Sequence, residues 1–175
     1  MTKAFSHERV SDGKDEWLTP PELIKALGVF DLDPCSPIVR PWDTALEHYT
    51  IEDDGLMLPW EGRVWLNPPY GRMTTKWMEK MARHNDGIAL IFARTETATF
   101  TKYVWPVADS VLFLDYRLTF CHVTGKQADN SGGAPSCLIA YGSQNTQALI
   151  DSKLTGTIVK PIHTRSRYGA YSDDA

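Results

Sequence analysis

The sequence predicts a single α/β domain with a compact, mostly parallel twisted sheet, flanking helices and an antiparallel C-terminal strand. Helix-like and strand-like patterns alternate between residues 64 and 115, which favours parallel strands joined by right-handed crossovers. Residues 88–93 form a continuous apolar run, typical of a strand buried on both faces. The strand expected over residues 136–141 has no room for a preceding crossover helix, so we expect it to run antiparallel.

The composition is that of an ordinary globular chain. Of 175 residues, 42% are hydrophobic and 23% are charged, which suffices for one core. The net charge of -4 argues against a protein that coats nucleic acid without specificity, although it allows a local basic face. No apolar run approaches the roughly 18 residues of a membrane span, and the N-terminus is too polar for a signal peptide. We therefore expect a cytoplasmic protein that does not enter a membrane.

The cysteines and histidines show none of the spacings of a metal site. Cys35, Cys121 and Cys137 are odd in number and lack a C-x-x-C pair, which favours reduced thiols over a disulfide or a metal role. The histidines likewise lack zinc-ligand spacing. We expect no bound metal.

The domain is expected to span residues 15–162. The first 14 residues are polar and are expected to form a flexible arm, and residues 163–175 are expected to form a polar tail. There is no internal repeat, and no change of composition marks a second domain.

The first elements are a helix and a strand. Residues 20–27 carry an apolar stripe at helical spacing. Thr19 is expected to be the N-cap, Glu22 to complete a capping box, and Gly28 to end the helix. Residues 30–35 alternate apolar and acidic side chains and are expected to form a strand that ends at a proline turn.

Residues 36–62 contain three prolines and no clear periodicity. A loop this long in a compact domain is usually functional. Within it, Asp53-Asp54-Gly55-Leu56 is a turn signal. Asp54 either serves only this turn or directs its carboxylate towards a ligand, and spacing alone favours the turn.

The remaining elements follow from the same patterns. Helices are expected over residues 74–85, 97–105 and 145–154, strands over residues 64–66, 88–93, 111–115, 136–141 and 157–162, an extended segment over residues 117–123, and a flexible polar loop over residues 125–135.

The most informative stretch is Val64-Trp65-Leu66-Asn67-Pro68-Pro69-Tyr70-Gly71, a short apolar strand that ends in a stiff turn. The two prolines lock φ near -65° and supply no N–H. Asn67 and the carbonyl of Pro68 therefore present two hydrogen-bond acceptors aimed at one point, and Tyr70 offers a flat face beside them. We call residues 67–70 the acceptor turn.

The acceptor turn suits the activation of an exocyclic amine on a planar base. The lone pair of such an amine is delocalised into the ring, which makes the amine a poor nucleophile. Two acceptors that bind both N–H groups favour a more tetrahedral nitrogen, whose lone pair attacks an electrophilic methyl group. The ring of Tyr70 would stack on the base once it has left the duplex.

Carboxyl ends of parallel strands meet at one edge of a sheet, where open α/β sheets bind ligands. This edge is expected to gather Asp33, the acceptor turn and residues 94–97. Asp33 either receives the ammonium or ribose hydroxyls of a nucleoside-like cofactor or only forms the turn before Pro34. Arg72, Arg94 and Arg117 lie at or near this edge and are either contacts for phosphate or bases or solvated surface charges.

Over residues 15–141 the chain resembles the small DNA N6-adenine methyltransferases carried by phages and prophages. The motifs that carry this resemblance are Trp17-Leu18-Thr19-Pro20, Leu32-Asp33-Pro34-Cys35-Ser36, Asp54-Gly55-Leu56, the stretch from Trp60 to Gly71 with the acceptor turn, Trp77, and Pro135-Ser136-Cys137-Leu138-Ile139-Ala140-Tyr141-Gly142. The resemblance implies a Rossmann-like methyltransferase fold, S-adenosylmethionine as cofactor and double-stranded DNA as substrate, in the cytoplasm of a bacterial host.

The resemblance also implies roles for single residues. Asn67 and the Pro68 carbonyl would orient the amine, with Pro69 completing the turn, and Tyr70 would stack on the flipped adenine. The residues that would bind the cofactor are Trp17, Thr19 and Pro20 upstream, Asp33 and Pro34 after the first strand, and Asp54.

Two departures from the wider methyltransferase class are visible. The turn after the first strand, residues 33–37, contains no glycine, whereas the wider class usually has a glycine-rich turn there. The chain also has no room for a separate target-recognition domain. Sequence preference would have to come from the loops at residues 36–62 and 125–135.

Other functions remain compatible with these residues. Cytosine N4 and a glutamine amide present the same planar-conjugated NH2 group as adenine N6. A catalytically degenerate methyltransferase fold that binds nucleic acid or a partner is a further alternative, motivated by the missing glycines.

Overall fold

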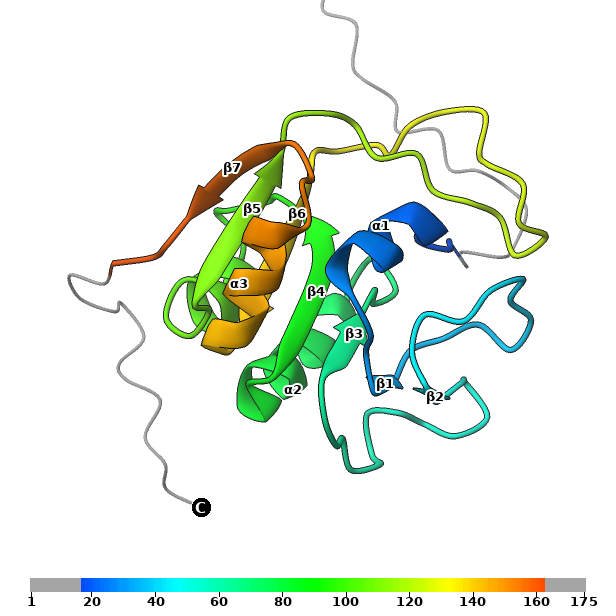
Figure 1. Cartoon of the computed structure of the whole chain (residues 1–175). Coiled ribbons are helices and arrows are strands. Elements are labelled where there is room, and N and C mark those ends of the chain that lie inside the picture. Colours follow the sequence, from blue (N-terminus) through cyan, green and yellow to red (C-terminus); the bar gives the residue numbers. More distant parts are fainter. Residues whose placement is uncertain (1–16, 163–175) are drawn as a thin grey trace, which may run out of the picture.

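The computed structural model describes residues 17–162, and the expected arm (1–14) and tail (163–175) lie outside the described residues. One sheet has the strand order β2-β1-β3-β4-β6-β5-β7 (Figure 1). Its strands are β1 (Leu32–Asp33), β2 (Glu47–His48), β3 (Val64–Leu66), β4 (Gly87–Phe92), β5 (Ser110–Leu114), β6 (Ser136–Tyr141) and β7 (Gly156–Val159). The helices are α1 (Pro21–Leu27), α2 (Thr74–His84), the π-helix η1 (Phe100–Val104) and α3 (Ser143–Asp151).

The strand directions confirm the expected mixed sheet. β1 pairs in parallel with β2 and β3, and β3 pairs in parallel with β4. β6 is antiparallel to both β4 and β5, so β1 to β5 all run in the same direction. β7 is antiparallel to β5 at the edge of the sheet. The α/β, Rossmann-like fold is therefore confirmed, with two antiparallel strands at its C-terminal end.

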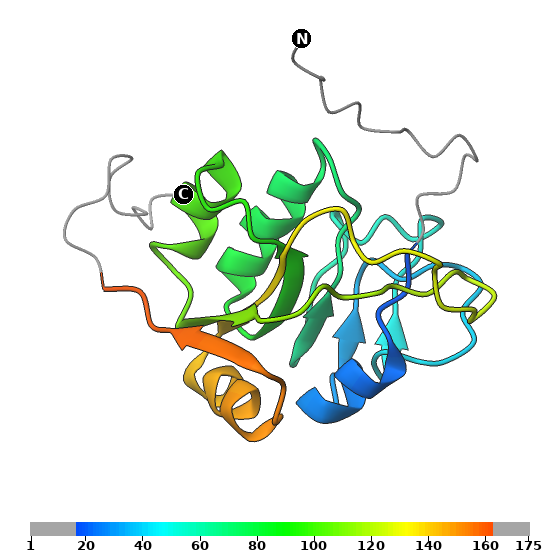
Figure 2. The same cartoon turned by 90° about the horizontal axis from the view of Figure 1, so that it is seen from above.

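Helices cover both faces of the sheet (Figure 2). On one face α2 and η1 pack against Ala89 and Ile91 of β4, and on the other α1 and α3 pack against Ile88 and Leu90. This alternation explains why β4 is apolar at consecutive positions, since each of its faces meets a layer of helices. No helix among residues 17–162 is long and apolar enough to cross a membrane.

The N-cap expected for the first helix is wrong. Helix α1 begins at Pro21, Pro20 occupies the cap position, and no side chain caps the helix. Pro20 and Pro21 have no N–H, so the first turn offers few donors to a capping hydroxyl. The side chain of Thr19 is buried, and its Oγ1 lacks a partner among the described residues. Gly28 ends the helix with φ +89°, as expected.

Other segments also differ from expectation, and the strand expected over residues 30–35 is limited to the two residues of β1. The segment over residues 36–62 contains β2, whose two residues pair with β1. The helix expected over residues 97–105 winds as the π-helix η1, in which Trp105 N donates to the Phe100 carbonyl over 2.9 Å. Residues 117–123 form no sheet strand, but Cys121 makes isolated bridges to Leu18 and Gln127. The loop after β5 is thereby tied to the N-terminal segment.

Candidate active site

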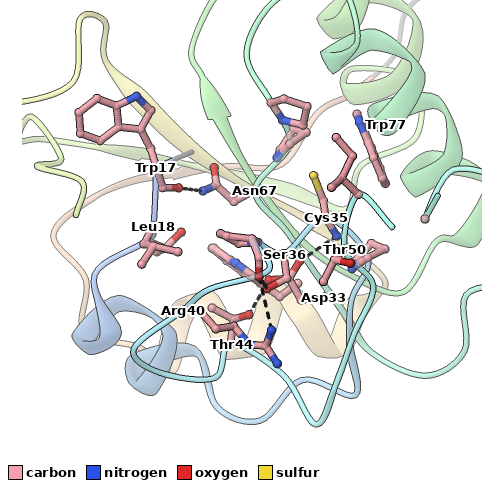
Figure 3. Close-up of a pocket in the computed structure, with 18 of the residues that line it drawn as sticks. Trp17, Leu18, Asp33, Cys35, Ser36, Arg40, Thr44, Thr50, Asn67 and Trp77 are labelled. Atoms are coloured by element: carbon pink, nitrogen blue, oxygen red, sulfur yellow. Dashed lines mark hydrogen bonds between the residues drawn. The ribbon is translucent and has the colours of Figure 1, made fainter. Parts of the chain in front are cut away.

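A cavity of about 670 Å³ opens where β1 and β3 end (Figure 3). Its volume lies in the range of small-molecule sites. Five of the six expected cofactor residues line it, namely Trp17, Thr19, Asp33, Pro34 and Asp54. All four residues of the acceptor turn line it as well. The parallel pairing of β1 with β3 therefore brings Asp33 and Pro34 to the same cavity as the acceptor turn, which begins more than 30 positions further along the chain.

The amide of Asn67 is fixed on one side only. Its Nδ2 donates to the backbone carbonyl of Trp17 over 2.9 Å. Its Oδ1 is buried at the cavity and has no hydrogen-bond partner among the described residues. Because Nδ2 is held by Trp17, the acceptor atom of the amide is the one left for a ligand. A buried acceptor without a partner costs about 1–3 kcal/mol of stability, and an N–H donor that binds here would remove this cost.

The ring of Tyr70 is held by two other aromatic rings. It stacks on Phe92 of β4 with a centroid distance of 4.1 Å and an interplanar angle of 14°. Phe120 meets it edge-on, with the centroids 6.2 Å apart. Burial raises the pKa of the Tyr70 phenol well above its usual value, so the hydroxyl stays neutral. The hydroxyl has no partner among the described residues.

Asp33 is almost completely buried, with 4% of its surface exposed. One carboxylate oxygen accepts from Cys35 N over 3.0 Å, and the other accepts from Thr44 Oγ1 over 2.5 Å. Burial raises the pKa of Asp33 from 3.8 to about 6, although both hydrogen bonds and the charge of Arg40 oppose this shift. The carboxylate is thus ionised at neutral pH, in a place that disfavours its charge. The bond to Cys35 also shows that Asp33 forms the turn after β1 in the absence of glycine.

Asp54 lies in a tightly turned segment of the loop. Residues 51–57 form consecutive turns, which confirms the turn expected there, and Asp54 has a left-handed φ of 53°. Its backbone carbonyl accepts from Met57 N over 2.8 Å and from Leu58 N over 3.3 Å. Its exposed side chain borders the cavity, so the turn and a ligand contact are compatible with one another.

Four residues predicted from the sequence lie outside the cavity lining: Pro20, Arg72, Arg94 and Arg117. The three arginines are exposed. The guanidinium of Arg94 lies 5.9 Å from the ring centroid of Phe92, the residue on which Tyr70 stacks. Arg117 donates to the Gly132 carbonyl over 3.3 Å. Arg94 is therefore the predicted arginine with a described link to the acceptor turn.

The cavity lining also includes residues that were not predicted as site residues, among them Arg40, Trp42, Thr44 and Trp77. Trp42 donates its indole N–H to the Thr19 carbonyl over 3.2 Å, and Thr44 binds Asp33. Both come from the segment at residues 36–62, where no periodic pattern shows which side chains turn inward. The length of this segment and its Asp54-Gly55-Leu56 motif predicted that it contributes to a site, but neither pointed to Trp42 or Thr44.

The described residues offer no alternative centre based on metal or thiol chemistry. Among residues 17–162, no group of three or more His, Cys, Asp and Glu side chains is arranged to hold a metal ion. The three cysteines are free, and burial raises the pKa of each thiol. They are therefore protonated and unreactive at neutral pH.

Comparison with known proteins identifies the family of the chain. Searches of curated proteins and of solved structures found no match to the chain. One family model, described as DNA N-6-adenine-methyltransferase (Dam), matches residues 6–156. That range contains the cavity, the acceptor turn and every strand that borders them. The chain therefore belongs to the DNA N6-adenine methyltransferase (Dam) family.

Proposed function

We propose that this protein transfers a methyl group from S-adenosylmethionine to the N6 amine of adenine in double-stranded DNA. Membership of the family supplies the reaction class. The observation that carries the proposal is the Oδ1 atom of Asn67, a buried acceptor without a partner at the wall of the cavity. Trp17 holds the other end of the same amide, so the acceptor cannot rotate away without loss of a hydrogen bond.

The acceptor turn activates the amine by orientation. Asn67 Oδ1 accepts one N–H of the adenine amine, and the Pro68 carbonyl accepts the other. Both acceptors are in place before the reaction, so little reorganisation is needed as positive charge develops on nitrogen. The surplus proton is lost to water, because neither an amide nor a peptide carbonyl is a strong base.

The residues around the cavity fit S-adenosylmethionine, which supplies an electrophilic methyl group when bound. The Thr19 hydroxyl is buried, borders the cavity and has no described partner, so it is free to bind a polar group of the cofactor. The ionised carboxylate of Asp33 favours a hydroxyl or a cation nearby. Pro34, Trp17 and Asp54 complete the walls around them.

The DNA substrate requires a base that has left the duplex. The stack of Tyr70 on Phe92 supports an aromatic platform beside the amine acceptors, and base stacking on such a ring is worth roughly 1–3 kcal/mol. Arg72 and Arg94 follow the acceptor turn and β4 at the same edge of the sheet, which suits contacts to phosphate. We place this activity in the cytoplasm of a bacterial host. The loops at residues 36–62 and 125–135 would recognise the DNA sequence around the target adenine.

The test combines activity with cofactor binding. Unmethylated genomic DNA is incubated with enzyme and S-adenosylmethionine, digested to nucleosides and examined by mass spectrometry for N6-methyladenine. The variant Asn67→Ala should lose about 10²–10³ in rate, the usual effect of removing one fixed hydrogen-bonding group. Its affinity for the cofactor, measured by calorimetry, should remain within about twofold.

The outcomes distinguish the alternatives. N4-methylcytosine in place of N6-methyladenine would change the substrate base, and label found only in added protein would overturn the DNA assignment. A folded wild-type protein that does not bind S-adenosylmethionine would favour a non-enzymatic binding module. Full activity of Asn67→Ala would refute the role of the acceptor turn.

A further inference from the structure

Lys80 of α2 binds three backbone carbonyls with one ammonium group. Its Nζ donates to Gly55 over 3.1 Å, to Leu56 over 2.9 Å and to Leu58 over a shorter distance. An ammonium has three donors and no acceptor, so this arrangement uses its full hydrogen-bonding capacity. The ammonium also lies 5.0 Å from the ring centroid of Trp60. Burial lowers the pKa of Lys80, and the charge of Asp54 opposes this effect.

The segment that Lys80 binds is a wall of the cavity. Asp54, Gly55 and Leu56 all line the cavity, as do Asp33 and Pro34 of the turn after β1. The backbone of Gly55 lies so close to this turn that an added Cβ would come within 2.0 Å of the Pro34 carbonyl oxygen. A small displacement of the segment therefore changes the shape of the site where the cofactor is proposed to bind.

Local structure alone does not fix this wall. The hydrogen bonds within it are those of consecutive turns, such as Met57 N to the Asp54 carbonyl, and residues 54–58 belong to no strand or helix. Ile51 and Met57 expose 84% and 80% of their surfaces, so packing contributes little at these two positions. The long-range bonds come from Lys80, and the nearby Trp60 adds a local one, in which its indole N–H donates to the Gly55 carbonyl over 2.8 Å.

We propose that Lys80 is a positioning residue that holds residues 54–58 against the turn after β1 and so keeps the cofactor site in its binding conformation. The proposal rests on the proposed function for the identity of the ligand. It gives helix α2 a part in cofactor affinity. Among the described lining residues, α2 contributes no charged side chain to the cavity, so Lys80 acts through the segment that it holds. Loss of Lys80 should weaken cofactor binding and not slow methyl transfer, because Lys80 does not contact the acceptor turn.

The test compares Lys80→Met with Lys76→Met. Lys76 lies one turn earlier on α2, is exposed and has no described side-chain partner, so both variants remove one positive charge from the same helix. The first readout needs no ligand and is hydrogen–deuterium exchange of the peptide that covers residues 50–60. Exchange there should become at least about tenfold faster in Lys80→Met and stay unchanged in Lys76→Met, since only the former releases the three carbonyls.

The second readout is the dissociation constant of S-adenosylhomocysteine, measured by calorimetry, together with KM and kcat. If the competent conformation falls to about one tenth of the population, the apparent dissociation constant and KM for the cofactor rise about tenfold. The value of kcat at saturating cofactor should stay within about twofold. Should Lys80→Met fail to fold, Lys80→Gln takes its place, because it removes the charge but keeps two of the four methylene groups and an N–H donor.

Unchanged exchange at residues 50–60 in Lys80→Met, or equal effects in Lys76→Met, would overturn the proposal. So would a loss of kcat with unchanged affinity. A failure of the proposed function gives a different result, because the wild-type protein itself would then not bind S-adenosylhomocysteine, whereas the exchange experiment would still report on Lys80.

Discussion

Replacing Asp33 by asparagine is expected to stabilise the fold at neutral pH, because this carboxylate is ionised in a buried site. Its pKa is raised from 3.8 to about 6, chiefly by burial. Asparagine has nearly the same shape. Its Oδ1 can accept from Cys35 N, and its Nδ2 can donate to Thr44 Oγ1, so both hydrogen bonds can be kept without the charge.

The magnitude follows from the two pKa values. At about 1.36 kcal/mol per pKa unit, the difference between 3.8 and about 6 corresponds to about 3 kcal/mol. Between these values the unfolded chain is ionised while the native carboxyl still holds its proton, so the unfolded state binds fewer protons. The contribution of Asp33 to the free energy of unfolding therefore falls as pH rises from about 4 to about 6 and stays constant at higher pH. Asp33→Asn should gain up to about 3 kcal/mol at pH 7.5 and about 1 kcal/mol at pH 4.5.

Urea unfolding of both proteins at pH 7.5 and pH 4.5 measures this difference. Thr44→Val is the control, since it removes a hydrogen bond from the charged form and should destabilise more at pH 7.5 than at pH 4.5. An Asp33→Asn variant that is less stable than the wild type at pH 7.5 would refute the reasoning. An equal gain at both pH values would also refute it, because the effect would then not come from ionisation.

Two further predictions concern Tyr70 and Thr19, whose hydroxyl groups have no hydrogen-bond partner among the described residues. Tyr70→Phe should keep the methylation rate within about threefold, since the hydroxyl has no described partner. Phe92→Ala should weaken DNA binding by roughly tenfold, because the ring on which Tyr70 stacks is lost. Gel-shift and activity assays compare the two variants, and a stronger effect of Tyr70→Phe than of Phe92→Ala would contradict this reasoning. Thr19→Val should raise the free energy of unfolding by about 1–3 kcal/mol, since it removes a buried hydroxyl without a partner. The same change should weaken cofactor binding in calorimetry, and a variant that is both less stable and unchanged in affinity would show that the hydroxyl is satisfied within the protein.

Local patterns predicted the elements whose stability depends on their own side chains. The continuous apolar run of β4 reflects its burial on both faces, and the apolar stripe of α2 reflects its packing on one side against the sheet. The acceptor turn was equally visible, because two prolines impose its geometry on any fold. These features need no knowledge of distant residues.

Features that depend on distant residues were not visible. β2 has two residues, and its pairing with β1 leaves no periodic trace in the sequence. Thr19 carries the signature of an N-cap, yet its hydroxyl lies at the cavity, since the helix begins two residues later. Trp17 was expected to contact the cofactor, but its carbonyl also holds Asn67, which lies 50 positions further along the chain. No local pattern encodes such a bond.

The distribution of unsatisfied atoms links the stability of the fold to its function. Among residues 17–162, the buried side-chain polar atoms without a partner belong to Thr19, Asn67, Tyr70 and Ser136, and the first three of these residues line one cavity. Each such atom costs about 1–3 kcal/mol, and the buried charge of Asp33 in the same cavity adds about 3 kcal/mol at neutral pH. A fold shaped only for stability would spread or remove these costs, whereas a site prepared for a polar ligand concentrates them where the ligand relieves them. The acceptor of Asn67 is then the atom with the most to gain from an amine donor.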